Sequence, residues 1–203
     1  MSRRPLQNRV DPFGELVATP ARGMLLGNRG GRFHRDDQTL GRRRWASKLW
    51  IACVCEFKGR RRSVWGRGYT ELFFYDEITA FAAGHRPCFE CRRKEAEAFR
   101  ALFPGVTRRR APEMDVVLHA ERLNGRDKRV SRRPLERLPD GAMIALDSHA
   151  YAVRGDALLP WSFAGYGAPR SRASIGMVEV LTPRAIVAVL EAGYRPRWGE
   201  ARA

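Results

Sequence analysis

Short apolar runs, separated by glycine, proline and charged residues, dominate the hydrophobic pattern of the N-terminal half of the chain. Residues 49–57 form a nearly continuous apolar run followed by Lys58-Gly59-Arg60, which predicts a buried strand that ends in a turn. A second strand is predicted over 69–74. Residues 1–47 show no sustained periodicity, and within them Gly27–Arg32 has the composition of a flexible basic loop.

The pattern changes to short strands in the C-terminal part of the chain. From Leu138 onward, apolar runs at 142–146 and 150–153 flank a polar pair, which predicts a hairpin. Residues 177–181 predict another strand. This half therefore contributes mainly β-structure.

Three helices follow from capping and stop signals. Asp76 is a favoured N-cap for a helix that Gly84 would end. A second helix is predicted over about 93–103, before a Pro-Gly pair. A final helix is predicted over 183–191, with Thr182 as its cap. Strands and helices in these proportions predict an α+β fold.

The charge of the chain is large and uneven. The 203 residues include 38 basic and 22 acidic groups, which gives a net charge of +16. Residues 1–62 hold 15 basic and 5 acidic groups and residues 92–133 hold 13 and 6, whereas residues 138–203 hold 7 and 6. Two concentrated basic segments favour a binding face for nucleic acid; an anionic membrane surface and an acidic protein are the alternatives. Arg42, Arg43 and Arg44, which precede Trp45, are candidate phosphate contacts.

The four cysteines are the strongest chemical signal. Cys88 and Cys91 form a Cys-x-x-Cys knuckle next to Arg92 and Arg93, with the spacing that lets two thiolates bind one zinc ion. Cys53 and Cys55 lie two apart in a predicted strand, so they would share a face and could complete a four-cysteine site. The alternatives are that this second pair packs as small hydrophobic residues, or that His34 supplies a ligand.

One cluster resembles an active site. Asp115, His119 and Glu121 lie within 114–123, a segment that its periodicity assigns to neither helix nor strand. On a strand all three would share a face, whereas on a helix only Asp115 and His119 would align. Such a set could bind a catalytic metal or activate water for phosphodiester cleavage, and the alternative is a polar, solvent-facing edge.

The region around the knuckle resembles a known module. FFYDE at 73–77 and AAGHRPCFECR at 82–92 resemble the second half of the Ada-type zinc-binding domain, which has a Phe-Phe strand end, a short helix and then Ala-Gly-Phe/Tyr-Arg-Pro-Cys-x-x-Cys-Arg. This chain departs from the family by placing His85 at the aromatic position. Its upstream cysteines also form Cys-x-Cys where the family usually has Cys-x-x-x-Cys.

The resemblance implies zinc and contact with DNA. It implies that Cys88 and Cys91 are zinc ligands and that Arg86 and Arg92 lie near the phosphate path. In the DNA-repair members of that family, an upstream cysteine accepts a methyl group from a phosphotriester. The corresponding candidates here are Cys53 and Cys55.

Together these observations predict three parts. Residues 1–47 would form a basic Gly/Arg-rich segment, residues 48–107 an Ada-like zinc module, and residues 108–203 a β-rich portion with a final helix. The expected function is zinc-containing nucleic-acid binding, with DNA preferred over RNA. A metal-dependent nuclease and a methyl acceptor are the alternatives.

The sequence also indicates where the protein resides. No apolar run approaches the roughly 20 residues needed to span a bilayer, and no secretory signal follows Met1. We therefore expect a cytoplasmic protein without a membrane partner. In a reducing compartment, cysteines favour metal binding over disulfides.

Overall fold

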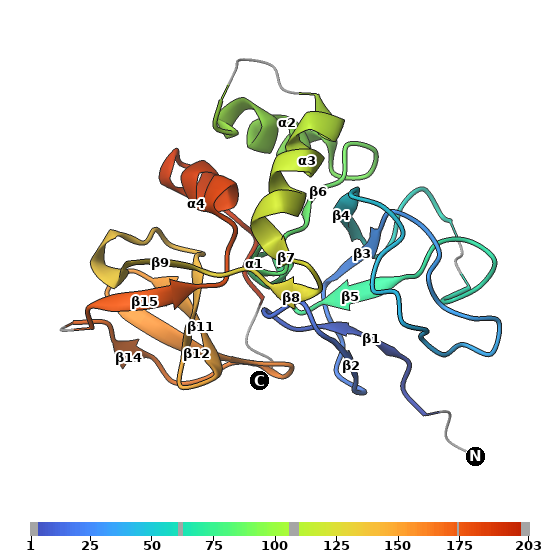
Figure 1. The fold of residues 1–203 in the computed structure, drawn as a ribbon, viewed down its shortest axis with the longest axis horizontal. Helices are drawn as coiled ribbons and strands as arrows, with labels where there is room; N and C mark the ends of the chain where they lie inside the picture. The colour runs from blue at the N-terminus through green and yellow to red at the C-terminus, as the bar shows by residue number, and fades with distance from the viewer. Residues whose placement is uncertain (1–3, 61–62, 106–109, 174, 200–203) are drawn as a thin grey trace.

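The described residues form two large β-sheets that stand side by side, with helices between and above them, and one short two-stranded sheet (Figure 1). The computed structural model describes residues 4–60, 63–105, 110–173 and 175–199. Strands and helices alternate irregularly along the chain, so the fold is α+β as the sequence predicts.

The first sheet is built from the N-terminal half of the chain. Its strand order is β2-β1-β5-β3-β4-β6. The six strands are β1 (Gln7–Val10), β2 (Leu16–Ala18), β3 (Leu25–Arg29), β4 (Trp50–Val54), β5 (Leu72–Phe74) and β6 (Arg86–Pro87). The predicted strands at 49–57 and 69–74 are confirmed as β4 and β5, each shorter than expected.

The central strand β3 lies where the sequence predicts a basic loop. All five of its residues are buried, including Asn28 and Arg29. A Cβ at Gly27 would lie 2.3 Å from the Ile51 carbonyl oxygen, so glycine is required for the close approach of β3 and β4. The prediction of a loop over Gly27–Arg32 is therefore wrong for its first three residues, because strand pairing and burial override their polar composition.

The second sheet comes from the C-terminal part, with the strand order β13-β12-β11-β10-β15-β9 and β14 paired to β12. Its strands are β9 (Ser131–Pro134), β10 (Met143–Leu146), β11 (His149–Arg154), β12 (Ala157–Ser162), β13 (Gly165–Tyr166), β14 (Arg170–Ser171) and β15 (Met177–Val180). The predicted hairpin is confirmed as β10–β11. Asp147 and Ser148 have φ of 47° and 62°, as a two-residue hairpin turn requires. A separate short hairpin joins β7 (Leu123–Asn124) to β8 (Asp127–Lys128).

Three helices lie largely where the sequence predicts them, and a fourth covers the segment that its periodicity leaves unassigned. They are α1 (Glu77–Ala82), α2 (Arg93–Leu102), α3 (Ala111–Arg122) and α4 (Arg184–Glu191), with a single 3₁₀ turn at Leu135–Arg137. Asp76 caps α1 by accepting the Thr79 amide at 2.8 Å, and Gly84 ends that helix at a φ of 82°.

The N-terminus of α4 differs from the prediction. Thr182 does not cap this helix, because its hydroxyl accepts the Met143 amide at 2.9 Å and ties α4 to the second sheet. The Glu121 carboxylate instead accepts the Ala185 amide at 2.7 Å, which satisfies one free donor at the start of the helix.

Contacts join the three predicted parts across both of their boundaries, which lie after residues 47 and 107. Strand β3 pairs with β4 over five residues, so residues before and after 47 belong to one sheet. One apolar core joins α1, α2, α3 and α4 across residue 107. Its buried members are Phe81, Phe99, Phe103, Met114, Leu118, Ala185, Ile186, Val189, Leu190 and Tyr194.

Candidate metal centre

Three of the four cysteines gather at one edge of the first sheet. The sulfur atoms of Cys53, Cys88 and Cys91 all lie within 4.8 Å of one another. In a tetrahedral zinc site with Zn–S bonds of about 2.3 Å, sulfur atoms lie about 3.8 Å apart. A small inward movement would therefore close the cluster around a metal ion, and the three soft thiols are suitable donors.

Strand pairing explains this convergence. Strand β6 runs parallel to β4, with Ile51 opposite Arg86 and Ala52 opposite Pro87. Cys53 follows Ala52 in β4 and Cys88 comes directly after the end of β6, so the two cysteines are brought side by side. The Cys88 amide donates to the Ala52 carbonyl at 3.1 Å and fixes this register.

The backbone around the knuckle favours a negative charge on sulfur. The Glu90 amide donates to the sulfur of Cys88 at 3.4 Å. Hydrogen bonds from the thiols of Cys53 and Cys91, followed by backbone amides, lower the pKa of Cys88. The pKa of Cys53 is raised, chiefly by its contacts with those two thiols. The cluster thus holds one thiolate readily, and further ionisation requires a cation, which a divalent metal would supply.

The other two candidate ligands lie outside the cluster. Strand β4 ends at Val54, so the alternation that would align Cys55 with Cys53 stops, and the exposed Cys55 thiol donates to the Met24 carbonyl at 3.5 Å. His34 is buried and stacked on Trp65, and its nitrogens contact the Thr70 hydroxyl at 2.8 Å and the Gly66 carbonyl at 3.0 Å. Both nitrogens of His34 are therefore occupied.

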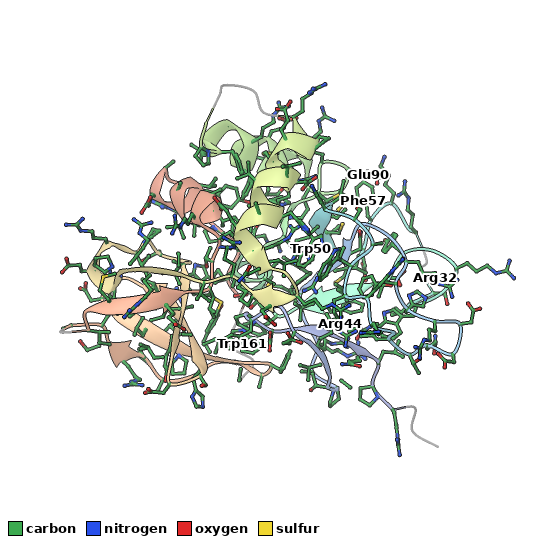
Figure 2. All side chains as sticks on the ribbon, viewed as in Figure 1. Arg32, Arg44, Trp50, Phe57, Glu90 and Trp161 are labelled. Atoms are coloured by element: carbon green, nitrogen blue, oxygen red, sulfur yellow. The ribbon has the colours of Figure 1, made fainter. Side chains whose placement is uncertain are left out.

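A cleft of about 390 Å³ opens beside the three thiols. Its wall includes the buried Glu71 and the rim residues Arg60 and Glu90, which pair at 2.8 Å; Glu90 is labelled in Figure 2. Among the described residues only three thiols converge, so the fourth position of a bound metal would face this cleft. Three protein ligands and one open position are typical of metal sites that also bind water or substrate.

The expectation that Arg86 and Arg92 contact phosphates does not fit the structure, because both side chains are buried. Arg86 forms two parallel hydrogen bonds to Asp115, at 2.9 and 2.8 Å. Arg92 pairs with Glu77 at 2.7 Å, and both of those side chains are fully buried. These ion pairs tie the knuckle to α3 and α1, and they leave neither guanidinium exposed for a nucleic acid.

Asp115, His119 and Glu121 do not form a common site. Asp115 is occupied by Arg86, and Glu121 binds the start of α4. The Nδ1 atom of His119 accepts a hydrogen bond from Arg122 at 3.0 Å. Burial, followed by repulsion from Arg122, lowers the pKa of His119. The segment is a helix, and its polar side chains bind different neighbours.

Comparison with protein-family models, curated proteins and solved structures gave no match. The likeness to the Ada-type domain is therefore supported only by the residues that carry it. The described residues contain no helix with the length and apolar character needed to cross a membrane.

The remaining candidate arginines are accessible. Arg42, Arg43 and Arg93 are exposed, and Arg44 is half-buried next to Trp45. The ring of Trp45 lies 6.0 Å from that of Trp50, on the side of the sheet that faces α3. Figure 2 labels Arg44, which lies in the connection from β3 to β4, and Trp50, the first residue of β4.

Sequence reasoning missed a second cluster, centred on Trp50. Arg29 and Arg122 both lie over its ring, at 4.0 and 3.8 Å from the ring centre, and His85 lies 5.0 Å away. Lys128 reaches the same region and donates to the Ala82 carbonyl. No local motif marks these residues, because they come from β3, β4, α3 and β8.

Proposed function

We propose that this chain is a zinc-containing nucleic-acid-binding protein in which the metal stabilises the fold. The convergence of Cys53, Cys88 and Cys91 carries the metal part of the proposal. Zinc is the proposed ion because it prefers thiolates and tetrahedral geometry and has no redox chemistry of its own. The cluster would link β4 to the turn before α2 and so hold the exposed Arg93 in place.

Charge supports the nucleic-acid part. The net charge of the chain is +16. The exposed arginines of the chain include Arg42 and Arg43, which lie close in sequence to the half-buried Trp45. Guanidinium groups bind phosphate oxygens, and an aromatic ring next to them can stack on a base. DNA is the preferred partner because the resemblance around the knuckle implies contact with DNA phosphates.

Salt dependence of binding tests this proposal. Fluorescence anisotropy of labelled duplex and single-stranded DNA, and of the matching RNAs, should show affinity falling steeply with salt, by about 0.9 log unit per log unit of salt for each phosphate contacted on duplex DNA. The double variant Arg42→Gln/Arg43→Gln should reduce that slope by about 1.8 if both arginines contact phosphates. Arg132→Gln/Arg137→Gln is the matched control, because both of those arginines are exposed on the other part of the molecule. Absence of binding at low salt would refute the proposal.

The open cleft favours one second candidate, a metal-dependent nuclease. Zinc with three thiolate ligands supplies an activated water in hydrolytic sites. The buried Glu71 lines the cleft and accepts the Trp65 amide at 2.7 Å, which holds its carboxylate in place to receive a proton. Zinc-loaded protein should then cleave DNA or RNA, and Glu71→Gln should abolish cleavage while zinc is retained. No cleavage of several substrates would exclude this candidate.

A further inference from the structure

A small cleft next to Trp50 is lined by an unusual number of cations. About 30 Å³ of it is open to the centres of water molecules, where one water requires about 10–15 Å³. This space suits two waters or one small oxyanion. The cationic lining residues are Arg29, Arg44, Arg122, Arg126 and Lys128, and Glu15 is the acidic one.

These cations form no close ion pairs with carboxylates in the described part of the chain. Within the described part of the chain, none of the five has a carboxylate oxygen within 4.0 Å. Arg29 donates to the Gly14 carbonyl at 2.8 Å, and Arg122 donates to the Gly84 carbonyl at 2.8 Å. Carbonyl oxygens satisfy the donors but carry no compensating full charge.

One guanidinium donor of a residue that lines this cleft has no partner in the described part of the chain. Arg122 is 1% exposed, and its Nε atom is buried without a hydrogen-bond acceptor among the described residues. Burial, followed by repulsion between Arg29 and Arg122, lowers the pKa of Arg122 to about 8. Buried charges in proteins are normally paired, so this arrangement lacks an anion.

We propose that this cleft binds a phosphate group, and specifically the terminal phosphate of a nucleic-acid strand. The inference rests on the proposed nucleic-acid function and specifies its contact point. Arginine forks match phosphate oxygens, and the space admits a phosphate headgroup but not a base. Trp45 also lines the cleft, and Arg42 and Arg43 lie next along the chain, where the rest of the strand would continue.

The first test measures phosphate binding by the full-length protein. Titration calorimetry with inorganic phosphate, against chloride at matched ionic strength, should detect saturable binding by the wild type. Arg44→Gln and Arg126→Gln, which change residues at the rim, should each weaken that binding about tenfold, as expected for one lost charge-assisted contact. Arg132→Gln lies outside the cleft and should bind as the wild type does. No phosphate-specific binding, or equal binding by the rim variants, would overturn the proposal.

The second test uses one oligonucleotide with a terminal phosphate at its 5′ or 3′ end, or with hydroxyl groups at both ends. The wild type should bind one phosphorylated form about tenfold more tightly, and Arg126→Gln should remove that preference. Tight but equal binding of all forms would overturn the terminal-phosphate assignment and leave the proposed function intact. Phosphate binding without any oligonucleotide binding would overturn the proposed function together with that assignment.

Discussion

The guanidinium carbon of Arg122 lies 3.8 Å from the centre of the Trp50 ring. Arg122 comes from the last turn of α3 and Trp50 from the first residue of β4, so the contact joins the helical layer to the first sheet. The same guanidinium donates to the carbonyls of Gly84 and Lys48, at 2.8 and 2.7 Å. It therefore holds three segments together at one point.

Replacing Arg122 with methionine should destabilise the protein. The change keeps apolar contact with Trp50 but removes the hydrogen bonds to the two carbonyls and the one to the His119 Nδ1 atom. Relief of repulsion from Arg29 offsets part of the loss. We expect the free energy of unfolding to fall by about 2–4 kcal/mol, given about 1.5–3 kcal/mol for each hydrogen bond to a charged group. Chemical denaturation measures this, with the exposed Arg132→Met as control. A fall no larger than that of the control would contradict the structural role.

Asp115→Asn should destabilise the protein because it leaves the buried Arg86 without its counter-charge. The loss in unfolding free energy should be about 3–5 kcal/mol. The double variant Arg86→Met/Asp115→Leu should lose less than the single variant, since it removes both charges. A catalytic role for Asp115 predicts the opposite pattern, with lost activity and stability near that of the wild type.

Stability should rise with pH between about 7 and 10, in part because of Lys128. Burial, followed by repulsion from Arg29 and Arg122 and opposed by Asp11, lowers the pKa of Lys128 from 10.5 to about 7. Between those values the unfolded chain binds more protons than the folded one, so raising the pH favours folding. Well below pH 7, Lys128 is protonated in both the folded and the unfolded state, so it no longer makes stability depend on pH.

The matched comparison is Lys128→Met. Its unfolding free energy, measured at constant ionic strength across this pH range, should rise less steeply than that of the wild type. Other groups, including the thiols, titrate in both proteins and cancel in the difference. Identical slopes would show that Lys128 keeps an ordinary pKa.

Gly84 and Gly125 form a natural pair for testing the helix stop before the knuckle. Both have positive φ, of 82° and 64°. A Cβ at Gly84 would lie 2.6 Å from the Cδ atom of Arg122, whereas a Cβ at Gly125 would meet nothing within 4 Å. Gly125→Ala should cost about 1–2 kcal/mol of unfolding free energy from backbone strain. Gly84→Ala should cost about 1–3 kcal/mol more, because the crowding forces Arg122 to move. Equal losses would contradict the close approach.

Local signals in the sequence predict much of the structure near the knuckle. Asp76 caps α1, Gly84 ends it, and the polar pair at 147–148 turns the second sheet's hairpin, because each needs only its neighbours in the chain. The segment at 114–123 has no clear period because two of its charged residues, Asp115 and Arg122, are buried. Asp115, for example, is buried against Arg86.

The candidate site depends more on tertiary structure. The proximity of Cys88 and Cys91 is expected from their spacing, but Cys53 joins them only because β6 pairs in parallel with β4. Cys55 lies outside the cluster because β4 ends at Val54, one residue before it. From the sequence, Arg86 and Arg92 are plausible phosphate contacts. Only the tertiary structure shows that both are buried, in ion pairs with Asp115 and Glu77.

The metal content of cysteine variants tests the central claim most directly. Protein purified under reducing conditions with zinc supplied, and analysed by elemental mass spectrometry, should contain about one zinc per chain in the wild type and in Cys55→Ser. Cys53→Ser, Cys88→Ser and Cys91→Ser should each lose most of it. A wild type without bound metal, or loss of zinc in Cys55→Ser with retention in Cys53→Ser, would contradict the three-thiol centre.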